Sequence, residues 1–221
     1  MQMNKYGQLP KVLGKYFISP KEMMFYQYLP IKMPGNTQPI YEPRLKCFDN
    51  IIGAICCDFI GEFGLDKYVE SYLYLCAKNL FQSKGCSYNR MGWHCDGFLT
   101  DDINYIWSDS CPTIFNNSDF NLTMNDRISM LEMESQALKE NDFNYEENQL
   151  IRLNQFNVHK VADVTKEGMR TFLKLSFSKD KYDLIGNSKN YMIDYDWQMK
   201  ERKAERNIPQ SAIENVGSNG I

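Results

Sequence analysis

The chain has very few histidines and no long apolar run. Its 221 residues include only two histidines, His94 and His159. Any site that uses imidazole groups must therefore draw on these two positions. The longest apolar stretch, residues 51–60, is interrupted by Asp58 and is too short to cross a bilayer. The sequence therefore predicts no membrane span.

Paired cysteines and an excess of one charge are also lacking. The seven cysteines are an odd number, form no C-x-x-C pair and follow no secretory leader, which is typical of reduced thiols in a cytoplasmic protein. The 25 basic and 28 acidic residues nearly cancel and leave a formal net charge of -3. This balance disfavours nucleic acid as a partner, although a local basic patch would not show in the count.

Aromatic residues, in contrast, are abundant. The chain contains 14 tyrosines and 13 phenylalanines. This content favours a strand-rich core and excludes an intrinsically disordered chain. A length of 221 residues suits a single domain with its own hydrophobic core.

Local patterns divide this domain into three parts. Residues 1–71 contain closely spaced prolines, which predict an N-terminal arm with short strands, followed by apolar residues spaced by three and four. That spacing predicts a supporting helix over residues 44–63, which ends at Gly64. Residues 72–178 form the expected core. Residues 179–221 are polar and predict a C-terminal extension with docked pieces around residues 191–197 and a flexible end.

Alternation of apolar and polar residues predicts the strands of the core. Strands are expected over residues 68–80 and 103–107. The clearest pattern lies in residues 150–161 and 169–177, where alternation continues on both sides of a turn at Lys166–Gly168. This arrangement predicts a β-hairpin.

A helix interrupts the expected strands. Residues 123–126 resemble a capping box and lead into apolar residues at helical spacing, so we expect a helix over residues 128–139. The polar residues 139–148 that follow predict a surface loop.

A His-x-Asp motif lies before the strand at residues 103–107. His94 and Asp96 are two residues apart, and Gly92 and Gly97 flank them as expected hinges. In an extended segment, His94 and Asp96 point to the same side while the residue between them points away. Cys95 is therefore interpreted as a small buried residue rather than as a redox thiol.

His159 completes a candidate metal site with this motif. It lies on the first strand of the expected hairpin, 65 residues after His94. Two imidazoles and one carboxylate on one face of a metal leave the opposite coordination positions open, as in non-haem iron(II) oxygenases. Arg170 follows eleven residues after His159, and its planar guanidinium matches both oxygens of a carboxylate.

The pattern of His-x-Asp, a distal histidine and an arginine about ten residues further on resembles the 2-oxoglutarate- and iron(II)-dependent oxygenase superfamily. The resemblance covers residues 72–178. It implies a mainly β fold with flanking helices, in which two facing sheets form a double-stranded β-helix of the jelly-roll, cupin-like kind. It also implies an enzyme that uses molecular oxygen and 2-oxoglutarate to hydroxylate a C–H bond, with release of succinate and carbon dioxide.

The resemblance implies a role for each residue of the motif. His94, Asp96 and His159 would be the catalytic ligands of Fe(II), and Arg170 would bind the distal carboxylate of 2-oxoglutarate. Ser176 would line the same pocket, but Phe172 stands where the family's Arg-x-Ser arrangement has its serine. The substrate is expected to be a small molecule or a peptide side chain. Candidate pocket residues are those with polar tips and flat faces near the motif, namely Tyr88, Asn89, Arg90, Trp93, Asn104, Tyr105 and Trp107.

Other interpretations remain open at this point. A lone His-x-Asp pair is more often a loop or a hydrogen-bonded core pair than a metal site, and Arg170 also suits a structural ion pair. Tryptophans are more often core than substrate platform. Two other functions fit the same residues, a non-catalytic metal-binding jelly-roll sensor or binding protein, and a zinc hydrolase.

Overall fold

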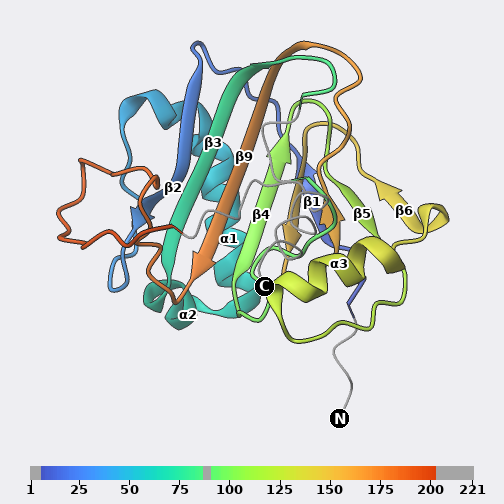
Figure 1. Cartoon of the computed structure of the whole chain (residues 1–221). Helices are drawn as coiled ribbons and strands as arrows, with labels where there is room; N and C mark the ends of the chain where they lie inside the picture. Colours follow the sequence, from blue (N-terminus) through green and yellow to red (C-terminus); the bar gives the residue numbers. More distant parts are fainter. Residues whose placement is uncertain (1–5, 87–90, 203–221) are drawn as a thin grey trace.

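The computed structural model describes residues 6–86 and 91–202. These residues form a mainly β structure with a six-stranded antiparallel sheet in the order β1-β7-β4-β9-β3-β2 and a three-stranded sheet in the order β6-β5-β8 (Figure 1). The strands are β1 (Lys11–Lys15), β2 (Met24–Lys32), β3 (Tyr72–Gln82), β4 (Ile103–Ser108), β5 (Ile114–Asn116), β6 (Asp142–Asn144), β7 (Gln149–Leu153), β8 (His159–Lys160) and β9 (Gly168–Ser178). The helices are α1 (Asp49–Phe63), α2 (Leu65–Glu70) and α3 (Asp126–Gln136), with 3₁₀ turns at Pro43–Phe48 and Lys139–Asn141.

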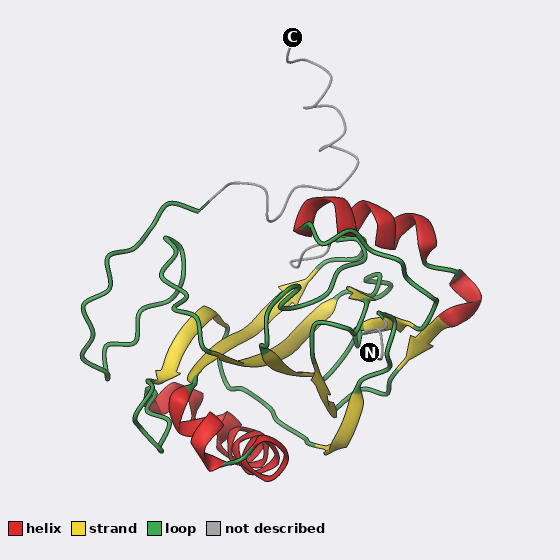
Figure 2. Ribbon diagram, turned by 90° about the horizontal axis from the view of Figure 1, so that it is seen from below, coloured by secondary structure: helices red, strands yellow, loops and turns green. Residues whose placement is uncertain are grey.

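The helices lie on opposite sides of the large sheet. Figure 2 shows α1 against one side of the strands and α3 on the other side. On the α1 side, Leu173, Leu175 and Phe177 of β9 are buried in the main core, and Phe59 of α1 stacks on Phe177 with ring centroids 3.8 Å apart. The alternate residues of β9 face the other side, where the candidate site lies.

The predicted supporting helix is confirmed. Its apolar residues Ile51, Ile52, Ile55 and Phe59 are buried, which is the face that the spacing by three and four predicts. Gly64 ends the helix with a φ of 89°, a conformation that favours glycine. The predicted start at residue 44 is a 3₁₀ turn, and the α-helix itself begins at Asp49.

The predicted β-hairpin is wrong. β7 pairs with β1 and β4, and β9 pairs with β3 and β4, while β8 pairs with β5 in the small sheet. Two asparagines break the first predicted strand, because Asn154 Oδ1 accepts from Phe156 N at 2.9 Å and Asn157 Oδ1 accepts from Asn154 N at 2.7 Å. Such side-chain-to-backbone bonds replace the sheet hydrogen bonds and turn the chain toward the other sheet.

Three smaller expectations also need correction. The strand predicted over residues 68–80 begins at Tyr72, because residues 65–70 form α2. The expected loop over residues 139–148 contains β6. The helix expected over residues 128–139 is α3, which spans Asp126–Gln136. Its cap is Asn125, whose Oδ1 accepts from the backbone N–H groups of Arg127 and Ile128.

After β3 the chain passes repeatedly between the two sheets. After β3 in the large sheet, His94 makes an isolated bridge to β8 in the small sheet, and the chain returns to the large sheet as β4. β5 and β6 then lie in the small sheet, β7 in the large, β8 in the small and β9 in the large. This alternation brings sequence-distant residues to the space between the sheets. In the described part of the chain, no helix is long and apolar enough to span a membrane.

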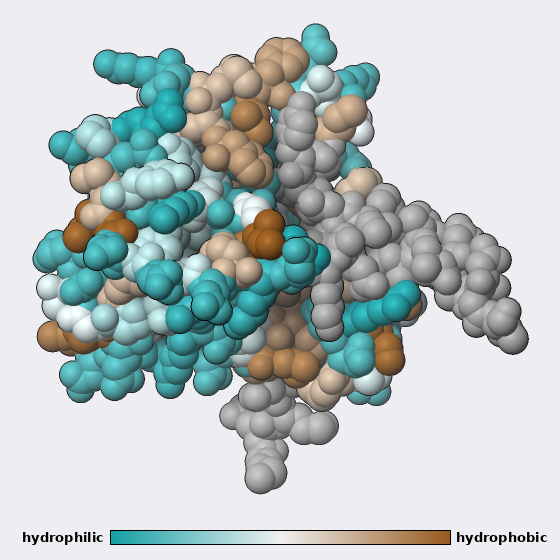
Figure 3. Space-filling view, turned by 60° about the vertical axis from the view of Figure 1, so that its left-hand side comes forward, coloured by the Kyte–Doolittle hydropathy of each residue, from teal (hydrophilic) through white to brown (hydrophobic). Residues whose placement is uncertain are grey.

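The segment after β9 packs back on the large sheet. Leu184 forms a parallel bridge with Lys200, and Lys200 Nζ pairs with Asp183 Oδ2 at 2.8 Å. Asn190 is buried and donates to the carbonyls of Pro30 and Ile40 at 2.9 and 2.7 Å. The face in Figure 3 is mostly hydrophilic, with apolar groups in small scattered patches. Within residues 191–197, Trp197 packs edge-on against Tyr72 of β3, so a docked piece lies there as predicted.

Candidate metal centre

The two histidines lie side by side because a short antiparallel bridge joins their backbones. His94 N donates to His159 O and His159 N donates to His94 O, each at 2.9 Å. The ring centroids are 4.6 Å apart. The two histidines of the chain, 65 positions apart in sequence, therefore lie at one place, as the sequence predicts.

Asp96 reaches the same place from a turn. Gly92 and Gly97 have φ values of 83° and 70°, so the chain bends on both sides of His94 and Asp96 as expected. A Cβ at Gly97 would lie 2.8 Å from Thr100 Oγ1, so a larger residue would strain this turn. One nitrogen from each histidine and one oxygen from Asp96 lie within 4.8 Å of one another.

The backbone fixes which imidazole nitrogen carries the proton. His94 Nδ1 lies 2.9 Å from Gly92 O, and His159 Nδ1 lies 2.8 Å from Asn157 O. A carbonyl oxygen can only accept, so each Nδ1 carries the proton and each Nε2 of a neutral ring keeps its lone pair. Fixing the ring through its second nitrogen is the usual way in which proteins orient a metal-binding histidine.

A buried lysine of β9 pairs with the third donor. Lys174 Nζ lies 2.7 Å from Asp96 Oδ2, and His159 Nε2 lies 3.6 Å from the same oxygen. Burial acts to raise the pKa of Asp96, but the positive charge of Lys174 holds that pKa well below its usual value. The carboxylate is therefore ionised and suited to bind a cation.

A cavity of about 700 Å³ lies beside Asp96. Asn104 of β4 and Lys174 of β9 line it from the large sheet, and Met130 of α3 lines it from the opposite side. Tyr182 and Lys200 of the C-terminal segment complete its wall. The cavity therefore lies between the sheet, α3 and the end of the described chain.

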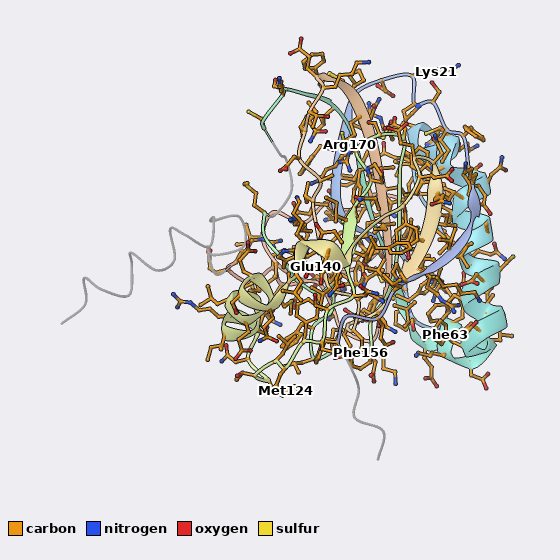
Figure 4. All side chains as sticks on the ribbon, turned by 90° about the vertical axis from the view of Figure 1, so that its right-hand side faces the viewer. Lys21, Phe63, Met124, Glu140, Phe156 and Arg170 are labelled. Atoms are coloured by element: carbon orange, nitrogen blue, oxygen red, sulfur yellow. The ribbon has the colours of Figure 1, made fainter. Side chains whose placement is uncertain are left out.

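Arg170 is buried but does not line this cavity among the described residues. Its Nε donates to Ser110 O at 2.8 Å and one terminal nitrogen donates to Cys111 O at 3.0 Å. Figure 4 places Arg170 near the beginning of β9, at the end of the large sheet away from Phe156. Binding of a distal carboxylate by Arg170 stays a prediction, and the contacts described favour a structural role in holding the loop after β4.

Ser176 and Asn104 lie on the cavity side of the large sheet. They are paired in register between β9 and β4, and Ser176 Oγ donates to Asn104 Oδ1 at 2.6 Å. Asn104 lines the cavity, as expected for a pocket residue. Ser176 itself does not line the cavity, and its predicted role in binding a cofactor stays a prediction.

Tyr105 and Trp107 do not line the cavity, contrary to the expectation. They alternate with Asn104 along β4 and face the opposite side of the sheet, where both are buried in the main core. Tyr105 Oη donates to Asp58 Oδ2, and Trp107 Nε1 donates to Tyr16 O, each at 2.9 Å. Proximity in sequence to the motif could not separate the two faces of this strand.

The remaining pocket candidates have different outcomes. Trp93 is buried in a second apolar cluster, and Lys160 Nζ lies 4.3 Å from the centroid of its ring. Tyr88, Asn89 and Arg90 lie outside the described residues. Cys95 is buried, as interpreted from its position between His94 and Asp96, and burial raises the pKa of its thiol.

Three residues of the site were missed by the sequence reasoning, namely Lys174, Asp102 and Tyr182. Lys174 had a visible signal, since a lysine between Leu173 and Leu175 of a buried strand needs a partner. Asp102 and Tyr182 had none, because their hydrogen bond joins positions 80 residues apart. Such pairs are visible only in the folded chain.

The chain was compared with protein-family models and with curated proteins. The chain matches no family model, and no curated protein matches it. Two imidazole nitrogens and one carboxylate oxygen suit iron, zinc and other divalent transition metals.

Proposed function

We propose that this protein is an Fe(II)- and 2-oxoglutarate-dependent oxygenase that hydroxylates a C–H bond of its substrate. One observation carries the proposal. His94, Asp96 and His159 bring donor atoms within 4.8 Å of one another, and backbone carbonyls orient both histidines through Nδ1. Three protein ligands leave coordination positions open for a cosubstrate and for oxygen.

The order of strands supports the same proposal. Segments that pass between a larger and a smaller sheet, with His159 on the smaller sheet and His94 bridged to it, support a double-stranded β-helix. This is the fold that the resemblance of the sequence implies.

The charges of the site also favour an anionic cosubstrate. Asp96 and Lys174 neutralise each other at 2.7 Å, so a divalent metal bound by Asp96 would add two positive charges beside this pair. 2-Oxoglutarate carries two negative charges at neutral pH and would compensate them.

Each part of the site has a separate task in this proposal. The iron, when bound by His94, Asp96 and His159, supplies the activation of oxygen that accompanies decarboxylation of the cosubstrate. The carbonyls of Gly92 and Asn157 hold the imidazole rings in one tautomer. The cavity wall orients the substrate beside Asp96 and limits the access of water.

The proposal is tested by metal binding and by cosubstrate turnover. Purified protein is expected to bind Fe(II) under anaerobic conditions and to convert 2-oxoglutarate to succinate when oxygen is admitted. His94→Ala should abolish both, because one of only three ligands is lost. Asp126→Asn is the matched control, since Asp126 lines the cavity outside the triad and its loss should leave iron binding intact.

Three results would contradict the oxygenase proposal. Failure of the wild-type protein to bind iron or 2-oxoglutarate removes its basis. Binding of metal with thermal stabilisation but no succinate across a broad substrate screen favours the non-catalytic sensor. Hydrolytic activity with zinc that 2-oxoglutarate does not affect favours the hydrolase.

A further inference from the structure

Asn104 carries a buried amide nitrogen without a partner, and this residue lies in the wall of the cavity. Its side chain is 2% exposed, and its Oδ1 accepts from Ser176 Oγ at 2.6 Å. Nδ2 makes no hydrogen bond within the described part of the chain. A buried donor without an acceptor is costly, so it marks a position where a ligand can supply the acceptor.

Lys174 offers further donors on the same face of the sheet. It lies two residues before Ser176 on β9, and Ser176 is paired with Asn104 of β4. Both Lys174 and Asn104 line the cavity. An ammonium group has three N–H donors, and the contact with Asp96 at 2.7 Å uses one of them. The wall beside Asp96 therefore presents a cation and an unpaired amide, which together suit a carboxylate.

Arg170 does not offer the same chemistry to the cavity. Two of its nitrogens donate to the carbonyls of Ser110 and Cys111, and its guanidinium lies 5.4 Å from the centroid of the Phe172 ring. Moving it toward the cavity would leave two carbonyls of the loop after β4 without these donors.

We infer that Lys174 and Asn104 form a carboxylate-binding subsite, and that 2-oxoglutarate places its distal carboxylate there instead of on Arg170. This inference rests on the proposed function. It assigns the recognition of the cosubstrate to residues that the sequence pattern of the family does not mark.

The test compares two oxo acids that share a metal-binding end. Protein loaded with redox-inert Zn²⁺ is titrated calorimetrically with 2-oxoglutarate and with pyruvate, which lacks the distal carboxylate. The wild-type protein should bind 2-oxoglutarate at least about tenfold more tightly. Asn104→Asp keeps an acceptor for Ser176 but replaces the unpaired amide by a negative oxygen. It should remove this preference and leave the affinity for pyruvate within about twofold.

Two further variants make the result decisive. Asn104→Leu removes the amide without adding charge, so it should reduce the preference for 2-oxoglutarate by less than Asn104→Asp does. It replaces Asn104→Asp if that variant does not fold. Arg170→Gln is the control and should keep the preference for 2-oxoglutarate. Loss of the preference in Arg170→Gln with retention in both Asn104 variants overturns the inference. An equal loss of affinity for 2-oxoglutarate and for pyruvate in the Asn104 variants also overturns the inference.

The inference and the proposed function can fail separately. Succinate formation with iron, together with an unchanged preference in the Asn104 variants, overturns the subsite and leaves the oxygenase. A preference that depends on Asn104 in the zinc-loaded protein, without succinate formation by the iron-loaded protein, supports the subsite and overturns the oxygenase. Failure of the zinc-loaded wild-type protein to bind 2-oxoglutarate overturns both.

Discussion

At the scale of single residues, the charged groups inside this protein differ in how they are compensated. Lys174 lies beside a carboxylate, and its contact with Asp96 keeps both groups charged. Lys32 is also buried, but its Nζ donates to the carbonyl of Ser71 at 2.6 Å and lies 4.8 Å from the ring centroid of Tyr68. Carbonyls and an aromatic ring compensate an ammonium less completely than a carboxylate does.

Lys32 is therefore expected to make stability depend on pH. Burial lowers its pKa to about 8, from 10.5 for the unfolded chain. Below pH 8 both states hold the proton and the folded state bears the cost of a buried charge. Between pH 8 and 10.5 the unfolded chain binds more protons, so this cost is lost as the pH rises.

Comparison of the wild-type protein with Lys32→Met isolates this effect. The variant keeps the length of the side chain and removes the charge, so its stability relative to wild type should be highest near neutral pH. The difference between the two proteins should fall by about 2 kcal/mol between about pH 7 and pH 10. Urea unfolding at both pH values measures it, and a difference that is constant with pH would contradict the assignment.

At the scale of elements, β9 joins the core to the site. One face carries Leu173, Leu175 and Phe177 into the core beneath α1, and the other face carries Lys174 and Ser176 toward the cavity. Because its two faces alternate residue by residue, packing against α1 sets the register that places Lys174 beside Asp96. The position of α1 on the sheet therefore matters for the chemistry on the opposite side.

Asp58 ties α1 to this sheet. Its Oδ2 accepts from Arg152 of β7 and from Tyr105 of β4, each at 2.9 Å. Asp58→Asn should lower the free energy of unfolding by about 2 kcal/mol, because two hydrogen bonds to a charged and mostly buried oxygen are weakened. Glu62→Gln is the matched control, since Glu62 pairs with the same arginine at 3.1 Å from a more exposed position.

The two variants should rank clearly in urea unfolding. The loss in Asp58→Asn should exceed the loss in Glu62→Gln, because solvent screens the more exposed pair. Equal losses would show that the charge of the acid, rather than its buried contacts with the sheet, holds α1 in place.

At the scale of the whole molecule, the C-terminal segment closes the structure around the cavity. Tyr182 stacks on Tyr74 of β3 with ring centroids 4.2 Å apart and donates to Asp102. Further along, Trp197 packs edge-on against Tyr72 of β3. These contacts make a segment outside the expected core part of the cavity wall, so changes in its docking should affect ligand binding.

Asn190 fastens this segment to the N-terminal arm. Asn190→Ala removes the donors to Pro30 O and Ile40 O and should cost about 2 kcal/mol of stability, because two carbonyls lose their partner. The C-terminal segment should also become more susceptible to limited proteolysis. Asn36→Ala, at an exposed position, serves as the control and should change neither measurement. Unchanged proteolysis of Asn190→Ala would show that the aromatic contacts suffice to hold the segment.

Much of the candidate site and part of the fold were predictable from local patterns. The helix before Gly64, the strand at Ile103–Ser108 and the glycines on both sides of His94 and Asp96 depend on residues close together in the chain. The grouping of the two histidines was also predictable, because only two are present. The pairing of strands was not, because alternation over residues 150–177 defines the faces of a strand but not its neighbours.

By itself, therefore, the sequence determined which side chains were available for a metal and which segments were helical or extended, because those properties depend on residue type and local spacing. The tertiary structure decided that β8 leaves the predicted hairpin for the small sheet and brings His159 to His94. It also decided that Lys174, rather than Arg170, lies beside Asp96. Both outcomes depend on contacts between residues far apart in sequence, which form only when the two sheets pack together.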